Sequence, residues 1–417
     1  MHISLIGTRG VPARYGGFET CVEEVGRRLV AMGDQVTVYC RVPAGVSAGA
    51  GTEDGGPETT PSRETTSRPA EYLGMRLVHL PAMRRKTLET LSHTALSVGH
   101  ATVHRCDVAF VFNAANAPLL PLLRLAKIPV VTHVDGLEWK RAKWSGAGQR
   151  YYQRAEALAV RWSDALIADA RGISDYYRQR FGVDTDYIPY GAPKLADIGA
   201  DRLAEHNLTA NRYHLVVARL EPENHVHLAV DGYRRSAARH PLIVVGSAPY
   251  AQEYTDRVHF LAGGDQRIRF LGGVWDQELL DQLYANALTY IHGHSVGGTN
   301  PSLLRAMGAG TATSAFDVNF NREVLGSNGR YFTEPAELAA LCEDAEADEA
   351  ATVRRGNAML DTLDRYDWDA VARDYRALAA RVLARRHGLV APAQRSGRDH
   401  DPTGDPTAAQ AAITPQP

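Results

Sequence analysis

The chain has 417 residues, of which 44% are hydrophobic and 23% are charged. A chain of this length and composition can bury two or three hydrophobic cores, which excludes disorder throughout. Its formal net charge is only -2, from 46 Lys and Arg against 48 Asp and Glu, which disfavours a general nucleic-acid-binding protein.

The 4 cysteines, at positions 21, 40, 106 and 342, are too scattered for a CxxC or a Cys/His metal motif. They indicate free thiols in a reducing compartment. The N-terminal MHISLIG is typical of a buried strand rather than a signal peptide, and no apolar run of about 18 residues predicts a membrane-spanning helix. We therefore expect a cytoplasmic protein.

Strands and helices alternate through the first half of the chain. Apolar stretches predict strands at 2–6, 35–40, 75–79, 107–112, 129–133, 164–168 and 187–189, with an amphipathic helix at 18–32. This alternation is typical of a parallel sheet with helices on both faces. Residues 41–70 are rich in Gly, Pro, Ser, Thr and Glu, which predicts a flexible loop.

The alternation then restarts, so the sequence predicts a second α/β unit. Its expected strands are 213–218, 242–246, 268–271, 289–292 and 311–315, with a helix at 226–238. Apolar residues between Trp368 and Val382 recur at helical spacing and predict a final amphipathic helix. The expected division is 1–192, 193–365, a helix within 366–388 and a disordered tail at 389–417.

The first motif is GTRGVPARYGGFET, residues 7–20, between the first strand and the first helix. Gly16 and Gly17 would let a ligand approach the backbone, and the helix N-terminus would offer N–H groups to a phosphate. Arg14 adds positive charge. A dinucleotide site is disfavoured because the glycine spacing differs from G-x-G-x-x-G and no acid ends the second strand. A glycine-requiring turn without a ligand is the remaining alternative.

The second motif is HVDGLEWKRAKW, residues 133–144, at the end of a predicted strand. Aromatic faces beside polar groups suit a sugar ring. The alternative is a surface helix whose tryptophans are half-buried anchors. Its candidate residues are Asp135, Glu138, Trp139, Lys140 and Arg141.

The third motif is ARLEPENH, residues 218–225, at the first strand end of the second unit. Arg219 could hold a diphosphate through two hydrogen bonds. A structural ion pair with Glu221 or Glu223 is the alternative.

The fourth motif is HGHSVGGTNPSLLRAMGAG, residues 292–310, where a strand leads through glycines into a helix. Pro301 fits the first helical position, with Thr299 or Asn300 as the cap. Gly297 and Gly298 would allow close approach, and the N–H groups of Asn300, Ser302 and Leu303 could face an anion.

His292 and His294 in this motif have the spacing of a metal pair. No third ligand is nearby in the sequence, which favours polar strand-end residues over a metal site.

Together these motifs resemble GT-B glycosyltransferases, and most closely a bacterial rhamnosyltransferase-like group of glycosyltransferase family 4. The resemblance also rests on LVHLPAMRRKTLETLSHT, YIPYGA and FDVNFNREVL, and covers about residues 1–40 and 72–385. It implies an α/β fold of two Rossmann-like domains facing across a cleft, with a C-terminal helix crossing back to the first domain.

The resemblance also implies roles for individual residues. Asp135 and Arg219 would be catalytic, Arg219 by neutralising the departing diphosphate. Gly16, Gly17, Arg219, Asn224 and the helix start would bind a nucleotide-sugar donor. Arg14 and the HVDGLEWKRAKW residues from Glu138 to Arg141 would bind the acceptor. The helix-start residues are Gly298, Thr299, Asn300, Pro301, Ser302, Leu303 and Arg305.

The expected reaction is a retaining, metal-independent transfer without a cofactor. The expected donor is dTDP-L-rhamnose, and the expected acceptor is a glycan or a polyprenyl-linked glycan of the cell surface. Peripheral contact with an anionic inner-membrane face is expected from the basic run Met83–Lys86 and the stretch that follows it. A solvated helix start is the alternative for this run.

Three positions depart from the broad family. In the fourth motif, the family carries two glutamates separated by seven residues, and after the third motif it carries a lysine. These positions are Gly297, Arg305 and Asn224. An arginine cannot accept hydrogen bonds from ribose hydroxyls. A second hypothesis is therefore a weakly active or inactive binding protein with the same fold.

Overall fold

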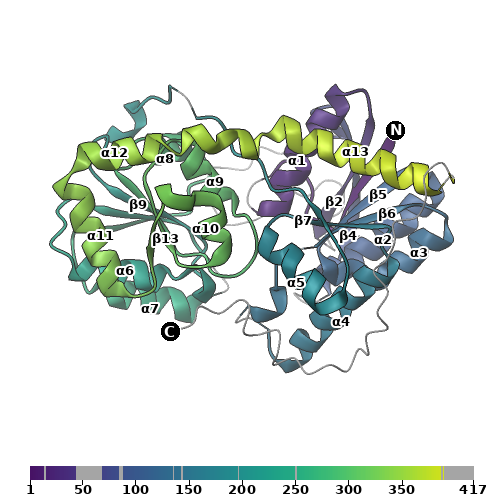
Figure 1. Ribbon diagram of the computed structural model, residues 1–417, viewed down its shortest axis with the longest axis horizontal. Helices are drawn as coiled ribbons and strands as arrows, with labels where there is room; N and C mark the ends of the chain where they lie inside the picture. Colours follow the sequence, from purple (N-terminus) through teal and green to yellow (C-terminus); the bar gives the residue numbers. More distant parts are fainter. Residues whose placement is uncertain are drawn as a thin grey trace, which may run out of the picture.

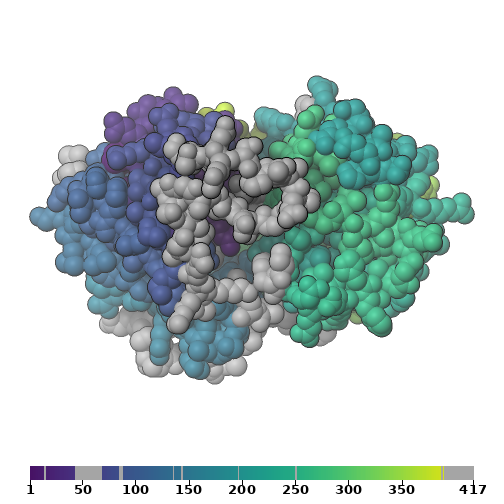
Figure 2. All heavy atoms as spheres, turned by 180° about the vertical axis from the view of Figure 1, so that it is seen from behind, coloured from purple at the N-terminus to yellow at the C-terminus, as the bar shows by residue number. Residues whose placement is uncertain are grey.

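The computed structural model describes residues 1–13, 16–43, 68–83, 88–134, 136–141, 144–195, 197–248, 251–386 and 388. The predicted tail, residues 44–67 of the predicted loop, and the candidate residues Arg14 and Asp135 lie outside these residues. Figure 1 shows two α/β units side by side, with a succession of helical segments from the end of the chain running along one edge, the last and longest of them along the first unit. Figure 2 shows the two units from behind, purple to blue and teal to green.

The first unit is built on an eight-stranded sheet of order β3-β4-β2-β1-β5-β6-β7-β8. Its strands are β1 (His2–Ile6), β2 (Gln35–Pro43), β3 (Glu71–Tyr72), β4 (Met75–Ala82), β5 (Val108–Phe112), β6 (Val130–Val134), β7 (Ala165–Ala168) and β8 (Asp186–Tyr187). Its helices are α1 (Gly17–Ala31), α2 (Glu89–His104), α3 (Leu120–Leu125), α4 (Gly146–Trp162) and α5 (Arg171–Phe181), with short 3₁₀ turns η1 (Ala114–Leu119) and η2 (Glu138–Lys140). Neighbouring strands are parallel except β3 and β4.

The second unit is built on a parallel six-stranded sheet of order β11-β10-β9-β12-β13-β14. Its strands are β9 (His214–Val217), β10 (Leu242–Val245), β11 (Ile268–Gly272), β12 (Thr289–His292), β13 (Thr313–Phe316) and β14 (Arg330–Phe332). Its helices are α6 (Val226–Arg235), α7 (Gln252–Ala262), α8 (Gln277–Ala285), α9 (Pro301–Gly308), α10 (Asn319–Leu325), α11 (Pro335–Ala347) and α12 (Glu349–Asn357). The 3₁₀ turns are η3 (Asp201–His206), η4 (Pro222–Asn224), η5 (Gly326–Asn328) and η6 (Leu360–Tyr366), and α13 (Trp368–Arg386) ends the described fold.

The central strands of the first sheet are apolar because helices cover both faces. β5 reads VAFVF and β6 reads VVTHV, and every residue of both strands is buried. Helix α1 packs its apolar side, with Cys21, Val22, Val25 and Leu29, into the same core. This packing places the loop before α1 at the carboxyl edge of the sheet, where ligands of parallel α/β proteins bind.

Two details of the first sheet differ from the sequence expectation. The predicted loop 41–70 begins too early, since β2 continues to Pro43 by pairing with β4, Arg41 opposite Leu80 and Val42 opposite Pro81. The short strand β3 was not predicted, because two residues are too few to show an alternating pattern.

Helix α13 confirms the predicted return to the first unit (Figure 1). Its Tyr375 hydroxyl lies 3.5 Å from the Cys21 sulfur of α1, and Arg376 donates a 2.7 Å hydrogen bond to Asp34. Arg381 of the same helix pairs with Asp186 in β8. The last helix, which follows the second unit in the chain, therefore packs on the first unit through apolar and ionic contacts.

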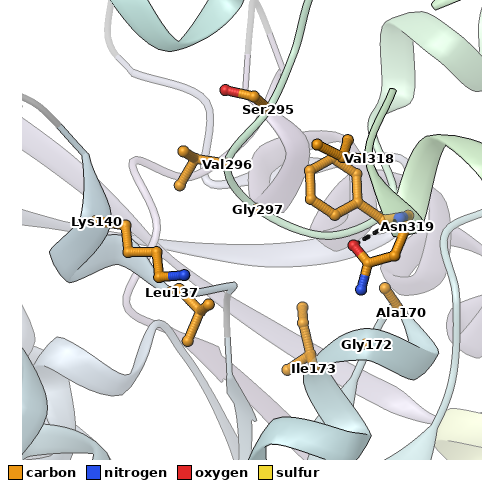
Figure 3. A pocket seen from close by; sticks show the side chains of 11 residues that line it. Leu137, Lys140, Ala170, Gly172, Ile173, Ser295, Val296, Gly297, Val318 and Asn319 are labelled. Atoms are coloured by element: carbon orange, nitrogen blue, oxygen red, sulfur yellow. Dashed lines mark hydrogen bonds between the residues drawn. The ribbon is translucent and has the colours of Figure 1, made fainter. Parts of the chain in front are cut away.

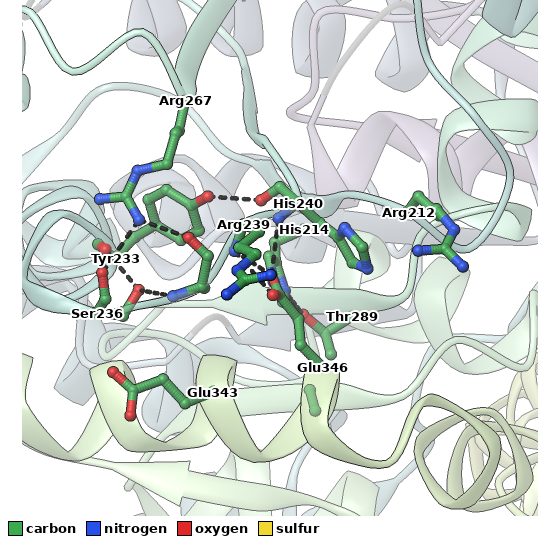
Figure 4. Close-up of polar contacts among 12 residues, drawn as sticks. Arg212, His214, Tyr233, Ser236, Arg239, His240, Arg267, Thr289, Glu343 and Glu346 are labelled. Atoms are coloured by element: carbon green, nitrogen blue, oxygen red, sulfur yellow. Dashed lines mark hydrogen bonds and ion pairs between the residues drawn. The ribbon is translucent and has the colours of Figure 1, made fainter.

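The opposite, amino-terminal edge of the second sheet carries a polar cluster (Figure 4). The Glu346 carboxylate of α11 accepts hydrogen bonds from the His214 ring at 3.1 Å and from the Arg239 and His240 N–H groups at 2.7 and 2.8 Å. Desolvation acts against the charge, but these hydrogen bonds lower the pKa of Glu346 to about 2. The cluster attaches α11 to the sheet and leaves the carboxyl edge open for other roles.

Candidate active site

The carboxyl ends of strands from both units meet around one cavity of about 100 Å³ (Figure 3). The first unit contributes residues that follow β6 and β7, and the second contributes residues that follow β12 and β13. The lining residues are Leu137, Lys140, Ala170, Gly172, Ile173, Ser295, Val296, Gly297, Val318, Asn319 and Phe320. Parallel α/β proteins bind ligands at the carboxyl ends of their strands, and pockets often lie between two domains.

Two helix N-termini also meet between the units. A Cβ atom placed on Gly17, the first residue of α1, would lie 3.5 Å from Cγ of Pro301, the first residue of α9. The N-cap residue of α1 is Gly16, which has no side chain to cap the helix, so within the described part of the chain no N-cap side chain takes its first N–H groups. The partial positive charges of two helix ends favour an anion at this point.

The start of α9 is partly as predicted. Asn300 is the cap, and its side-chain oxygen accepts a 2.9 Å hydrogen bond from the Ser302 N–H. The expectation that the Ser302 N–H is free for an anion is therefore wrong, because the asparagine cap already takes it. The Leu303 side chain is buried in the core, which leaves only its backbone for a ligand.

Close backbone contacts between the units explain several glycines. A Cβ atom on Gly136 would lie 2.4 Å from the carbonyl carbon of Gly297, and one on Gly298 would lie 1.9 Å from Oδ1 of Asp169. The Thr299 hydroxyl donates a 2.5 Å hydrogen bond to the Asp169 carbonyl. Any side chain at position 136 or 298 would push the two units apart.

Asp169 was missed in the sequence, although it directly follows the strand β7. It is buried between the units, and this burial raises the pKa of Asp169 to about 7. The rule that functional side chains follow parallel strands would have selected it. Nothing in the local sequence, however, shows that Gly298 comes to lie against it.

Arg219 lies at the cleft within a network of charged groups. Its side chain is 41% exposed, and its guanidinium lies 3.2 Å from the Glu221 carboxylate. Arg141 of the first unit lies 2.6 Å from Glu138, and 3.9 and 3.6 Å from Glu221 and Glu223 of the second unit. The structural ion pair left open for Arg219 is thus present, and Arg141 extends it across the cleft.

Of the predicted acceptor residues, Lys140 lines the cavity and Trp139 lies next to it in the chain. The Lys140 amine lies 5.7 Å from the centre of the Trp139 ring and points into the cavity in Figure 3. Burial lowers the pKa of Lys140. Glu138 is buried and forms an ion pair with Arg141, so its carboxylate already has a partner within the protein.

Asn224, His292 and His294 belong to the loops at the ends of β9 and β12. The His294 ring and the Asn224 side chain share a 2.7 Å hydrogen bond, while the centres of the two histidine rings are 5.9 Å apart. Among the described residues, no group of three His, Cys, Asp or Glu side chains is placed to hold a metal ion.

Arg305 is engaged in a contact that its sequence position did not reveal. Its guanidinium forms an ion pair with Asp281 of helix α8, next to α9. An arginine at this position therefore has a structural partner in the second unit.

Comparison with known proteins places this geometry in a class. Residues 16–191 match the family model of a glycosyl transferase 4-like domain, and residues 211–348 match that of glycosyl transferases group 1. With the two facing sheets and the returning helix, the chain is a glycosyltransferase of the GT-B fold.

Solved structures with the same fold cover nearly the whole chain. A sucrose-phosphate synthase from Thermosynechococcus elongatus superimposes with a TM-score of 0.74 at 20% identity, over 92% of this chain and 99% of that one. Anabaena HepE in complex with UDP gives a TM-score of 0.68 at 17% identity, over 91% and 100%. Identities this low establish the fold alone.

One curated relative has a related sequence over part of its length. The O-antigen chain mannosyltransferase B of Escherichia coli is 25% identical over 166 residues, which are 39% of this chain and 42% of the relative. The chain thus spans less than half of that relative.

Proposed function

We propose that the chain transfers a sugar from a nucleotide donor, with dTDP-L-rhamnose as the expected donor, to a glycan or lipid-linked acceptor in cell-surface polysaccharide synthesis. The observation that carries the proposal is the meeting of two helix N-termini, α1 at Gly17 and α9 at Pro301, beside the interdomain cavity. This place suits a diphosphate, whose negative charge the helix ends stabilise.

Arg219 would bind the departing diphosphate. Its guanidinium pairs with Glu221, so binding a diphosphate would exchange a carboxylate partner for a phosphate partner. The transition state gains most from this exchange because negative charge on the leaving group grows as the glycosidic bond breaks. Transfer would proceed with retention and without a metal ion, with Asp135 beside the reacting sugar.

The acceptor would approach from the first unit, where Lys140 lines the cavity and its amine lies 5.7 Å from the centre of the Trp139 ring. Arg141 and Glu138 would hold the loop in place through their contacts with the second unit. No helix in the described ranges has the length and apolarity needed to cross a bilayer.

A lipid-linked acceptor would require peripheral contact with an anionic membrane. Of the basic run Met83–Lys86, residues 84–86 lie outside the described residues; Met83 is 46% exposed, and Leu88, which follows the run, is 37% exposed. Leu96, further along α2, is also exposed, at 46%. The contact predicts sedimentation with phosphatidylglycerol vesicles that weakens with added salt, and sedimentation that is absent or independent of salt would contradict it.

The second candidate function is a weakly active binding protein with the same fold. It is favoured by the Arg305–Asp281 ion pair, which commits position 305 to a structural contact.

Titration calorimetry with dTDP-rhamnose, UDP-glucose and GDP-mannose, combined with turnover assays, tests both candidates. We expect one donor to bind and Arg219→Ala to lower turnover about 10²-fold or more. Arg235→Ala is the matched control, since Arg235 pairs with Asp231 on α6 and is 57% exposed. Binding without turnover would favour the second candidate, and absence of binding to every donor would reject the transferase.

A further inference from the structure

A continuous chain of hydrogen bonds links the loop after β9 to the loop after β12. The Asn224 amide nitrogen donates to the Arg219 carbonyl at 2.8 Å, and the Asn224 side-chain oxygen lies 2.7 Å from Nδ1 of His294. The His294 carbonyl in turn accepts a 2.9 Å hydrogen bond from Asn321. Both Asn224 and His294 are buried; the bond to Asn224 orients the imidazole ring, and the bond from Asn321 holds the His294 backbone.

These partners determine the tautomer of His294. A backbone carbonyl only accepts, so the Asn224 amide nitrogen must face Arg219 and its oxygen must face His294. The oxygen also only accepts, which requires the proton of the imidazole to be on Nδ1. Burial, together with the nearby charges of Arg141 and Arg219, lowers the pKa of His294 well below its ordinary value. Nε2 is therefore an unprotonated hydrogen-bond acceptor.

Nε2 of His294 lies next to Gly297, a residue that lines the cavity. A Cβ atom placed on Gly297, which lines the cavity, would lie 3.1 Å from this nitrogen. Gly297 has φ of +132°, so the backbone itself excludes a larger residue there. The imidazole thus takes the space into which a side chain at position 297 would point. Among the described residues, no group donates a hydrogen bond to Nε2.

We propose that Nε2 of His294 accepts a hydrogen bond from a hydroxyl group of the transferred sugar, which makes His294 a residue that determines donor specificity. The proposal rests on the proposed function, because it requires a nucleotide sugar in the cavity. A hydroxyl is the fitting partner, since it can donate to a neutral acceptor without bringing a charge near Arg141 and Arg219. A buried acceptor left without its donor also disfavours sugars that lack the hydroxyl.

Two substitutions separate the role of Nε2 from the role of Nδ1. In His294→Asn, the amide nitrogen can replace Nδ1 and keep the bond to Asn224, while the acceptor at Nε2 is lost. In His294→Gln, the longer side chain can place its oxygen near Nε2, while the bond to Asn224 is lost. The readout is the ratio of two dissociation constants from calorimetry, for the nucleotide sugar and for its nucleoside diphosphate alone.

The donor that binds wild-type protein is used, together with its nucleoside diphosphate. We expect His294→Asn to raise the ratio about tenfold through weaker sugar binding, with the diphosphate affinity within about twofold of wild type. His294→Gln should stay closer to the wild-type ratio. An unchanged ratio in His294→Asn would overturn the proposal, as would equal loss of diphosphate and nucleotide-sugar affinity.

Deoxy donors test the wild-type protein directly, even where a variant does not fold. For wild-type protein, one deoxy analogue should bind about tenfold more weakly than the parent donor. For His294→Asn, the same analogue should bind as tightly as the parent donor. If every deoxy analogue binds wild type as tightly as the parent, the proposal is rejected while the transferase assignment stands. Absence of binding to the nucleoside diphosphates as well would instead reject the donor site itself.

Discussion

The hydroxyl of Tyr375 in α13 and Nδ1 of His133 at the end of β6 share a buried hydrogen bond of 2.7 Å, between residues 242 positions apart. His133 is fully buried, and this burial lowers the pKa of His133 to about 3, so the ring is neutral. Nε2 of the ring has no other partner among the described residues. This contact joins the returning helix to the strand that leads into the HVDGLEWKRAKW loop.

Tyr375→Phe should destabilise the protein by about 1–2 kcal/mol, because it leaves a buried imidazole without its partner. Urea unfolding measures the change. Tyr331→Phe is the control, since the Tyr331 hydroxyl bonds the Gly326 carbonyl at an exposed position and its loss should cost less. Equal effects of the two substitutions would contradict the structural role of the Tyr375 hydroxyl.

Gly136→Ala should lower turnover more than it lowers the stability of the fold. The added methyl group would lie 2.4 Å from the Gly297 carbonyl carbon and would separate the two sides of the cavity. Displacement of reacting groups by about 1 Å can cost roughly 10²-fold in rate. Gly99→Ala in α2 is the control, because a Cβ atom there meets nothing within 4 Å. Normal turnover of Gly136→Ala would show that the close contact is not required.

Arg305→Glu alone should not improve nucleotide binding, because the new carboxylate would face Asp281. Combined with Asp281→Asn, the same carboxylate is free to accept hydrogen bonds from ribose hydroxyls. We expect the double variant to bind the nucleoside diphosphate about tenfold more tightly than Asp281→Asn alone, as measured by calorimetry. No gain in the double variant would place the ribose away from position 305.

Asp169 should make stability depend on pH. Burial raises its pKa to about 7, so the folded protein binds this proton more tightly than the unfolded chain does. Stability from this group is present below pH 4 and decreases as the pH rises towards 7. Asp169→Asn should therefore reduce the fall in melting temperature between pH 5 and pH 8.

Glu156→Gln is the matched comparison for Asp169→Asn. Burial also raises the pKa of Glu156 to about 7, and its partner Tyr176 lies in the first unit, 2.7 Å away. Both variants should flatten the pH dependence of the melting temperature, but only Asp169→Asn should change turnover, because Asp169 contacts Gly298 and Thr299. A steeper pH dependence in Asp169→Asn would contradict the assigned shift.

Local patterns were sufficient for much of the fold. Runs such as VAFVF in β5 predicted buried strands, because a strand covered on both faces has no polar side. Asn300 before Pro301 predicted the start of α9, because capping depends on neighbours in sequence. The glycines and arginines that follow strands pointed to the carboxyl edge of each sheet, where the cavity between the units lies.

Contacts between distant parts of the chain decided which partner each charged side chain has. Arg305 was expected at the donor, but it pairs with Asp281, and Arg219 and Arg141 meet carboxylates from both units. Asp169 of the first unit lies against Gly298 of the second, a contact between residues far apart in the sequence. No local pattern encodes such contacts, because they depend on how two separately formed sheets are oriented.

By itself, the sequence determined two α/β units, the strand ends that carry polar loops, and the amphipathic helix that follows them. Hydrophobic periodicity and capping act over a few residues, so they can be read along the chain. Only the tertiary structure decided which strand ends face each other, which charges are already paired, and that the acceptor nitrogen of His294 lies beside Gly297. These properties arise from packing, which brings together residues that the sequence keeps far apart.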